Sequence, residues 1–577
     1  MATKVLCQRS PVLFQTPVDV WGAGRSSESR AYCTVNTEGN TSLSTQRRSA
    51  NFQPTIWSYE KLQSLEKSRN IDAYKSKAEH LEREVRVMLA SEANMLVLLE
   101  LIDNVQRLGL GYRFKNDIRK ALDWFMELGG LSNDVIKSLS ATALGFRLLR
   151  QHGFHVSQDV FFKFKDEAGK FEEGHGEDVE GMINLYEASC LLVEGEDILD
   201  EGKTFTIRHL KNIKAKSDTD LAEKIRHILE LPLHHRIERQ EAQWTIKEYS
   251  RNGKAKGAVL QLAVLDFNVV QSVLQRDLRD LTRWWTGLEL ARRLSFSQDR
   301  LMESFFWSVG MAYEPQYGSC RRGITKLAQL VTTIDEVYEV YGTQELVLFT
   351  QEVDKWNIEA MEDLPDYMKL CFLALYNSVN HMAYEILMEQ GEYPLSYLTK
   401  SWSDLCKAYL QEAKWVNERA TPSFEEYLEN AWRSVGGACV LIHAYFMLGQ
   451  KATEKELEQL KGYNDLLRCS SVICRLCNDL LTSSAEIERG DTLNAITCYI
   501  KDAGVSEEEA RMYVNNVIDD TRKKINKYLI DKNTPFSEPF VETAINLARI
   551  SHVQYQQGDT KSKDGLQSLI LDSIYEW

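Results

Sequence analysis

The chain reads Ile334-Asp335-Glu336-Val337-Tyr338-Glu339 at one point and, about 140 residues later, Asn478-Asp479-Leu480-Leu481-Thr482-Ser483-Ser484-Ala485-Glu486. Both stretches interrupt apolar sequence. In a helix, residues four apart share a face, so Asp335 and Glu339 form one row of oxygen groups and Asn478, Thr482 and Glu486 form another. Mg²⁺ prefers oxygen ligands and usually shares its shell with substrate phosphates. The two rows predict a clamp for metal ions and a diphosphate; two solvated acidic faces are the alternative.

Length and composition narrow the class of protein. A chain of 577 residues is too long for one ordinary core, so we expect two or more domains. The net charge of −15 argues against nucleic-acid binding, which needs a basic face. No run approaches the ~20 apolar residues that span a bilayer, so we expect no membrane span. The eleven cysteines lack the paired spacing of a zinc site and are expected to be reduced, buried thiols.

Helical periodicity runs through nearly all of the chain after residue 57. In Ala78–Leu101 and Leu260–Leu274, apolar residues recur every three or four positions. Only ten prolines are present to break helices, and the alternation typical of strands is absent. The sequence therefore predicts an all-α fold.

Two changes in composition divide the chain. Residues 1–46 are rich in Ser and Thr and lack helical periodicity, which is typical of a removable plastid transit peptide. The alternative is a plain disordered tail, which would leave the protein in the cytosol. The polar, glycine-bearing segment Tyr249–Gly257 predicts a domain boundary. We therefore expect helical domains at 47–256 and 257–577, with both acidic rows in the second.

Short motifs in a fixed order carry a resemblance to a known family. They are Arg47-Arg48 with Trp57 after eight further residues, Leu101-Ile102-Asp103-Asn104-Val105-Gln106-Arg107-Leu108-Gly109, Phe146-Arg147-Leu148-Leu149-Arg150-Gln151-His152-Gly153-Phe154, Arg283-Trp284-Trp285, the two acidic rows, and Ser551-His552-Val553-Gln554-Tyr555. In this order, from Arg47 to the C-terminus, the chain resembles plant terpene synthases of the branch that holds plastidial monoterpene synthases and isoprene synthases.

The resemblance implies two helical domains: an N-terminal α-barrel-like domain without chemistry and a C-terminal domain with the class I terpenoid synthase fold. It implies that a prenyl diphosphate is ionised with Mg²⁺ or Mn²⁺, about three ions being typical of the family. It also implies that the twin arginine Arg47-Arg48 is part of a lid; from the residues alone, the pair is only surface charge. The oligomeric state is expected to be a monomer or a homodimer.

The resemblance also implies roles for single residues. Asp335, Glu339 and Arg475 match catalytic positions, and Arg475 shares a helix face with Asn478, which favours contact with phosphate. Aromatic rings stabilise cations without supplying a base, which favours Trp307 and Tyr555 as pocket walls; an ordinary core aromatic is the alternative for Trp307. The expected metal ligands are Asp335, Glu339, Asn478, Thr482 and Glu486. The expected substrate-binding residues are Gln298, Arg300, Trp307, Asp335, Glu339, Arg475, Asn478 and Tyr555.

The chain departs from the family pattern at its acidic and basic motifs. Glu336 and Glu339 stand where the family carries aspartate, and the longer arm is expected to shift the metal cluster or favour Mn²⁺. Gln298 stands where the family carries the first arginine of an Arg-x-Arg pair that ends here at Arg300. A neutral hydrogen bond is weaker than a charged one, so slower ionisation is expected.

The chain also departs from the isoprene synthase pattern, in which two phenylalanines shorten the pocket. The matching positions are Ala328 and Cys474, both small. Asn494 fits the isoprene pattern, whereas Val435 replaces its serine. A pocket with small residues at these positions predicts a substrate longer than five carbons.

These observations leave three hypotheses. The first is a monoterpene synthase acting on geranyl diphosphate, and isoprene is rejected as its main product. The second is a sesquiterpene or diterpene synthase acting on farnesyl or copalyl diphosphate. The third is a decayed homologue that binds prenyl diphosphates without ionising them, because Gln298, Glu336 and Glu339 all change together.

Overall fold

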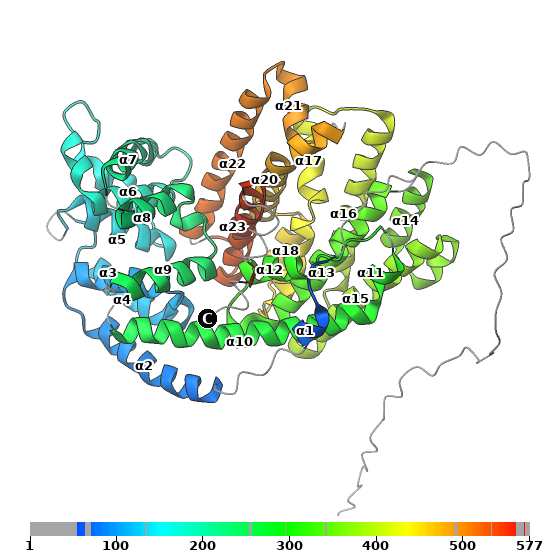
Figure 1. Cartoon of the computed structure of the whole chain (residues 1–577), viewed down its shortest axis with the longest axis horizontal. Helices are drawn as coiled ribbons and strands as arrows, with labels where there is room; N and C mark the ends of the chain where they lie inside the picture. The colour runs from blue at the N-terminus through cyan, green and yellow to red at the C-terminus, as the bar shows by residue number, and fades with distance from the viewer. Residues whose placement is uncertain are drawn as a thin grey trace, which may run out of the picture. The chain divides into compact units, whose positions relative to one another are not determined.

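The computed structural model describes residues 55–63, 71–132, 136–217, 219–252, 257–294, 296–340, 343–489, 493–531, 533–560 and 570–571. Regular structure in these residues is helical, and their one β feature is an isolated bridge between Lys165 and Phe171. The all-α prediction is therefore confirmed (Figure 1). The chain divides into the units Met1–Gln46 and Arg47–Trp577. The predicted transit peptide and the Arg47-Arg48 pair lie outside the described residues.

The helices fall into an earlier and a later group along the chain. The earlier α-helices are α1 (Tyr59–Gln63), α2 (Ile71–Ser91), α3 (Met95–Arg107), α4 (Lys115–Glu127), α5 (Leu139–Gln151), α6 (Val179–Ser189), α7 (Asp197–Lys216), α8 (Thr219–Glu230) and α9 (Glu238–Asn252). Short 3₁₀ helices lie between some of them: η1 (Gly111–Arg113), η2 (Gln158–Phe164), η3 (Glu173–Glu177) and η4 (Leu233–His235).

The later group contains the longest helices. They are α10 (Gly257–Leu288), α11 (Leu290–Arg293), α12 (Leu301–Met311), α13 (Gly318–Val340), α14 (Thr343–Lys355), α15 (Asp366–Gln390), α16 (Leu395–Glu418), α17 (Phe424–Ser434), α18 (Gly437–Met447), α19 (Glu454–Lys461), α20 (Asp465–Arg489), α21 (Ala495–Ala503), α22 (Glu507–Ile530) and α23 (Glu538–Thr560), with 3₁₀ helices η5 (Pro315–Tyr317) and η6 (Ile358–Asp363).

Side-chain caps explain where several helices begin. The periodic stretch 78–101 is not one helix, because the Asn94 side chain accepts hydrogen bonds from the Leu96 and Val97 amides and starts α3 after α2 has ended. Capping boxes, in which a hydroxyl and a glutamate three residues later bond each other's backbone amides, start α17 at Ser423, α19 at Thr453 and α22 at Ser506.

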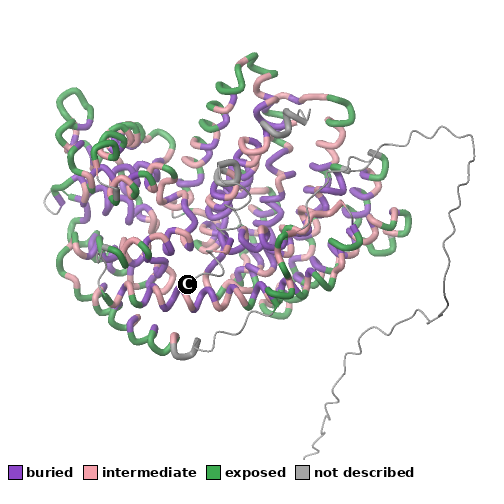
Figure 2. The backbone as a smooth tube through the Cα atoms, in the orientation of Figure 1, coloured by how far each residue is buried: buried purple, intermediate pink, exposed green. Residues whose placement is uncertain are grey.

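Two hydrophobic cores lie in the described part of the chain, and α10 belongs to both. The first core runs from Ala78 to Phe267, and the second is built mainly from Val270 onward. Figure 2 shows buried segments running through the interior of both helix groups. The cores therefore meet inside α10 between Phe267 and Val270, some ten residues beyond the predicted boundary at 256/257, which stays a prediction.

Helix α10 also bears on the expectation that no segment spans a membrane. The helical stretch Gly257–Arg293 is long and apolar enough to span one by length and composition, and half of its most apolar window is buried. Here α10 packs against α2 on one side of the molecule and against α12 and α13 on the other. Its apolar residues are thus used in the two cores.

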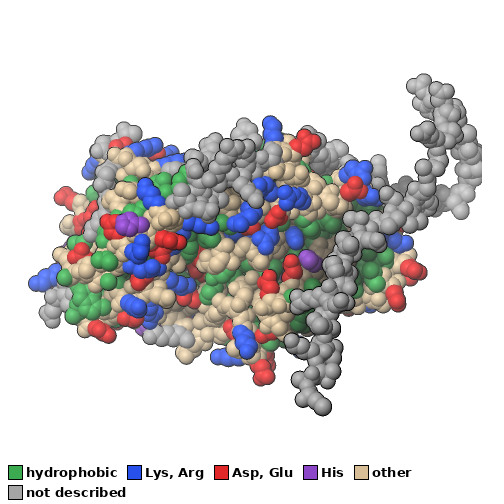
Figure 3. All heavy atoms as spheres, turned by 90° about the horizontal axis from the view of Figure 1, so that it is seen from below, with side chains coloured by type: hydrophobic (Ala, Val, Ile, Leu, Met, Phe, Trp, Pro, Cys, Tyr) green, Lys and Arg blue, Asp and Glu red, His purple; other side chains and the backbone are tan. Residues whose placement is uncertain are grey.

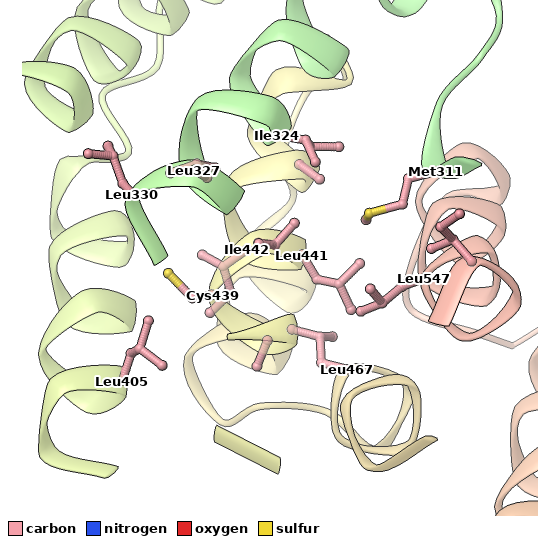
Figure 4. Close-up of a cluster of buried hydrophobic side chains, with 14 of the residues drawn as sticks. Met311, Ile324, Leu327, Leu330, Leu405, Cys439, Leu441, Ile442, Leu467 and Leu547 are labelled. Atoms are coloured by element: carbon pink, nitrogen blue, oxygen red, sulfur yellow. The ribbon is translucent and has the colours of Figure 1, made fainter. Parts of the chain in front are cut away.

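The second core positions the helices that carry the acidic rows. Figure 4 shows side chains from α12, α13, α16, α18, α20 and α23 meeting in one cluster: Met311, Ile324, Leu327, Leu330, Leu405, Cys439, Leu441, Ile442, Leu467 and Leu547. Because α13 and α20 both pack against α18, the two rows are fixed relative to each other by a common apolar support.

Charged side chains of both signs are interspersed over the described residues of the face drawn in Figure 3. Mixed signs on one face do not create the continuous positive field that attracts a phosphate backbone.

Candidate active site

Helix α13 presents two separate rows of polar side chains. Ala328, Thr332, Asp335 and Glu339 are spaced as i, i+4, i+7 and i+11, which places them on one face. Gln329, Thr333 and Glu336 form a neighbouring row, and all three are buried. The first row holds the predicted metal ligands of this helix. The second row binds a loop, so the adjacent acids Asp335 and Glu336 have different partners.

The carboxyl group of Asp335 lies in an electrostatically strained position. Burial raises its pKa well above the usual range, and the nearby carboxylates of Glu339 and Glu412 raise it further, whereas Arg475 opposes the shift. Several carboxylates close together disfavour the ionised form of each one, although Glu339 is exposed and Asp335 and Glu412 are half-buried. A bound cation would relieve this repulsion, so the site is suited to positive charge.

The other predicted ligand row, Asn478, Thr482 and Glu486, lies on α20. Asn478 and Thr482 are half-buried, and the Thr482 hydroxyl donates to the Asn478 carbonyl at 3.1 Å. Glu486 lies one turn further along the helix, and its side chain is outside the described part of the structure. Asp479 is not part of this row. It is buried and accepts hydrogen bonds from the Tyr427 hydroxyl (2.8 Å) and the Ala495 amide (2.9 Å).

Arg475 is held at the edge of the site by a buried network. Its Nε donates to the Tyr427 hydroxyl at 2.7 Å and lies 3.1 Å from an Asp479 oxygen. Its Nη2 lies 3.6 Å from a Glu412 oxygen, and Glu412 also accepts from Ser434 at 2.5 Å. The guanidinium thus joins α20 to α16 and α17, and it stands close enough to Asp335 to affect its pKa.

The loop before α12 carries Gln298 and Arg300. Glu336 accepts the Gln298 amide on both carboxylate oxygens, at 3.1 and 2.9 Å. Gln329 donates to the Gln298 carbonyl at 3.1 Å and accepts the Arg300 amide at 3.0 Å. The Gln298 side-chain oxygen accepts from Arg300 Nε at 2.6 Å. The glutamine at position 298 therefore orients the remaining arginine, and Glu336 fixes the backbone on which it stands.

Burial changes the chemistry of Glu336 as well. Its side chain is 3% exposed, and this burial raises its pKa to about 7, although the Gln298 amide lowers it. A carboxyl engaged with a backbone amide in this way is directed away from the row of Asp335.

An aromatic pair lies beside these charged groups. The Trp307 and Tyr555 rings, from α12 and α23, meet edge to face with centroids 5.7 Å apart, and both are half-buried. Burial raises the pKa of the Tyr555 hydroxyl, Cys474 raises it further, and Arg475 and Arg300 lower it. Both arginines are therefore near Tyr555, which places the aromatic wall next to the groups expected to meet a diphosphate.

Small residues and a helix break lie near the acidic rows. Ala328 is half-buried on the row of Asp335, and Cys474 is buried beside Arg475. Between α17 and α18 the chain passes through Gly436 with φ +78°, a conformation that glycine adopts without strain. A Cβ at Gly436 would come within 2.9 Å of Val331 on α13, so the break lets the two helices approach closely.

The donor set fits hard divalent ions. The available groups are carboxylate, amide and hydroxyl oxygens, which suit Mg²⁺ and Mn²⁺. Within the described residues no group of three His, Cys, Asp or Glu side chains could hold a metal by itself. This agrees with a site whose ligands are spread over two helices and completed by substrate oxygens.

Some residues of the site were missed by the sequence analysis. Glu412 and Tyr427 carry no motif, and only their positions in helical sequence 48 to 63 residues before Arg475 could have suggested them. Their contribution depends on the tertiary packing of α16 and α17 against α20, which no local pattern reveals.

Comparison with known proteins identifies this arrangement. The model of the terpene synthase N-terminal domain matches residues 56–229, and that of the terpene synthase metal-binding domain matches residues 286–524. The chain belongs to the terpene synthase family. It is 50% identical over 570 residues to chloroplastic isoprene synthase of Populus canescens, covering 97% of this chain and 96% of the relative.

Two solved structures show the same fold. A crystal structure of isoprene synthase from grey poplar leaves, with three Mg²⁺ ions and dimethylallyl-S-thiolodiphosphate, is 52% identical with a TM-score of 0.85, covering 90% of this chain and 99% of the other. A crystal structure of limonene synthase with 2-fluorolinalyl diphosphate is 38% identical with a TM-score of 0.88, covering 92% and 99%. The predicted family, the class I two-domain fold, the enzyme class and the divalent-metal cofactor of this terpene synthase are confirmed.

Proposed function

We propose that this terpene synthase converts geranyl diphosphate to a monoterpene, with release of diphosphate. The observation that carries the proposal is the small size of Ala328 and Cys474. Ala328 lies on the row of Asp335 on α13, and Cys474 lies four residues before Asn478 on the same face of α20, so both would border the place where the substrate chain extends. A pocket with alanine and cysteine at these positions has room for more than five carbons.

The roles of the residues follow from their positions. We propose that Asp335 and Glu339 on α13 and Asn478, Thr482 and Glu486 on α20 would hold the metal ions. When bound, these ions stabilise the charge that develops on the departing diphosphate.

The basic and aromatic side chains would serve the two halves of the substrate. Arg475 and Arg300 would donate charge-assisted hydrogen bonds to the diphosphate, and Gln298 would keep Arg300 oriented. Trp307 and Tyr555 would face the carbocation, because aromatic faces stabilise positive charge, and their apolar surroundings would exclude the water that quenches it.

Isoprene formation from dimethylallyl diphosphate is a second candidate. It is favoured by the 50% identity to isoprene synthase and by Asn494, which fits the isoprene pattern and caps α21 here. The small residues at 328 and 474 oppose it. Relatives of this similarity are chloroplastic, which supports the plastid location predicted for the chain.

Product analysis by gas chromatography–mass spectrometry tests the proposal. The chain beginning at Arg47 would be incubated with geranyl, farnesyl and dimethylallyl diphosphate, with Mg²⁺ and Mn²⁺ separately. Ten-carbon products at the highest kcat/KM are expected. A higher kcat/KM for isoprene from dimethylallyl diphosphate would overturn the proposal in favour of the second candidate, and turnover of farnesyl diphosphate alone would indicate a longer substrate.

A restored variant tests whether the altered motif marks decay. In the triple variant Gln298→Arg, Glu336→Asp, Glu339→Asp, a rise from measurable activity is expected. If the wild type turns over none of the prenyl diphosphates tested and only the triple variant is active, the result would favour the decayed homologue, which binds such substrates without ionising them.

A further inference from the structure

The first described helix, α1, packs on the core of the later helix group although its place in the sequence is at the start of the earlier group. Leu62 is 3% exposed and belongs to the core that continues from Val270, and Trp57 and Tyr59 pack against that core. Helix α1 also contacts α10. The segment 55–63 is therefore a structural part of the domain that holds the acidic rows.

Tyr59 reaches from this segment to the loop that carries Gln298 and Arg300. Its hydroxyl donates to Oδ1 of Asp299, the residue between the two. The same oxygen accepts from Nε1 of the buried Trp285 at 3.0 Å. The Asp299 side chain is thus bonded to α1 and α10, whereas the side chains of Gln298 and Arg300 bond each other.

The loop is thus held from two sides. On the α13 side, Glu336 and Gln329 bind the backbone of Gln298 and Arg300. On the other side, Tyr59 and Trp285 satisfy the Asp299 carboxylate. With the Tyr59 bond absent, this half-buried carboxylate would lose a donor, and the backbone that carries Gln298 and Arg300 would lose one of its two anchors.

We propose that Tyr59 is a positioning residue for diphosphate binding, acting through Asp299 to keep Arg300 directed toward the site. The inference rests on the proposed function for the identity of the substrate. The segment 55–63 would then contribute to the affinity for diphosphate as well as pack on the second core.

The test compares three full-length proteins: wild type, Tyr59→Phe and Tyr528→Phe. Tyr528 is a matched control, because its half-buried hydroxyl donates to Asn464 at 2.8 Å on the second-core side, between α22 and the turn before α20. The readouts are the Kd for inorganic pyrophosphate with Mg²⁺ by titration calorimetry, KM and kcat for geranyl diphosphate, and Tm.

For Tyr59→Phe we expect the pyrophosphate Kd and the KM to rise about 5- to 30-fold, as the loss of one or two hydrogen bonds predicts, with kcat changed by less than about twofold. The control should leave both constants within about twofold. In an Asp299→Asn background, the Tyr59→Phe effect should shrink, because the charged hydrogen bond through which Tyr59 acts is already removed.

Several outcomes would overturn the inference. A lower Tm with unchanged Kd and KM would show a purely structural role, as would equal effects of Tyr59→Phe and Tyr528→Phe. A wild type that does not bind magnesium pyrophosphate would also overturn it. A wild type that binds pyrophosphate but does not turn over geranyl diphosphate would refute the proposed function alone, since the binding comparison would still decide the role of Tyr59.

Discussion

Replacing Tyr427 with phenylalanine tests whether the network behind Arg475 serves the reaction. The Tyr427 hydroxyl is fully buried, accepts from Arg475 at 2.7 Å and donates to Asp479 at 2.8 Å. A hydrogen bond to a charged group is worth about 1.5–3 kcal/mol. Because Arg475 keeps its contact with Asp479 at 3.1 Å, part of the loss is recovered. We expect the variant to be destabilised by about 2 kcal/mol.

The catalytic effect of the same change follows from the freedom that Arg475 gains. If its misplacement costs about 1.4–2.7 kcal/mol of transition-state stabilisation, kcat/KM for geranyl diphosphate falls about 10- to 100-fold. Steady-state kinetics with product quantification, alongside calorimetric unfolding, measure both effects. The product distribution should stay the same, because the Tyr427 hydroxyl is bonded to Arg475 and Asp479, whereas the aromatic wall is formed by Trp307 and Tyr555.

Tyr463→Phe is a suitable control for this prediction. The Tyr463 hydroxyl donates to Asp404 at 2.8 Å, and Asp404 lies two turns of α16, about 12 Å, before Glu412. The control should lose stability but keep kcat/KM within about twofold of wild type. Equal losses of kcat/KM in the two variants, or none in Tyr427→Phe, would refute the reasoning.

Three further changes have defined outcomes. Ala328→Phe should fill the site beside the acidic rows. Because the ring takes up the volume of several methylene groups, the ratio of ten-carbon to five-carbon products, measured by chromatography, should fall at least about tenfold. An unchanged ratio would show that Ala328 does not border the substrate. Burial, followed by Glu238, raises the pKa of Glu314 to about 7. Between pH 4.5 and 7 the folded state therefore holds a proton that the unfolded state releases, so the free energy of unfolding should fall as pH rises through this window. In Glu314→Gln this pH-dependent fall, measured by denaturant titration of the metal-free protein, should be smaller by about 1–2 kcal/mol. Asp277→Ala should cost about 3–5 kcal/mol in unfolding experiments, because it leaves the buried Arg321 (2.6 Å in the native pair) without its carboxylate, while KM of the folded enzyme stays constant.

Periodicity was enough to predict the helices and the shared faces of the two acidic rows, and the order of short motifs drew attention to Arg475; metal binding by the rows stays a prediction. These are local properties: the spacing of Asp335 and Glu339 places them on one face in any helix. The separate partners of Asp335 and Glu336 were not predictable in the same way. Adjacent residues on a helix point about 100° apart, and only the position of the Gln298 loop shows that one of the two acids binds a backbone amide.

The roles of Glu412 and Tyr427 required the tertiary structure. Each is an ordinary residue of an amphipathic helix until α16 and α17 pack against α20 and bring both to Arg475. The same limit applies to the division of the chain. Composition marked the polar segment Tyr249–Gly257 as a boundary, whereas the assignment of a helix residue to one core or the other depends on which helices pack on each half of α10.

The double membership of α10 has a consequence for recombination between related enzymes. A chimaera joined at residue 256 would carry the first half of this helix with its new C-terminal partner, so the surface that meets α2 would come from the wrong parent. A junction between Phe267 and Val270 would keep the side chains of each core from one parent, apart from Leu62 and Ile237, which lie before the junction but belong to the second core. The uninterrupted helix α10 would then connect the two cores across the junction.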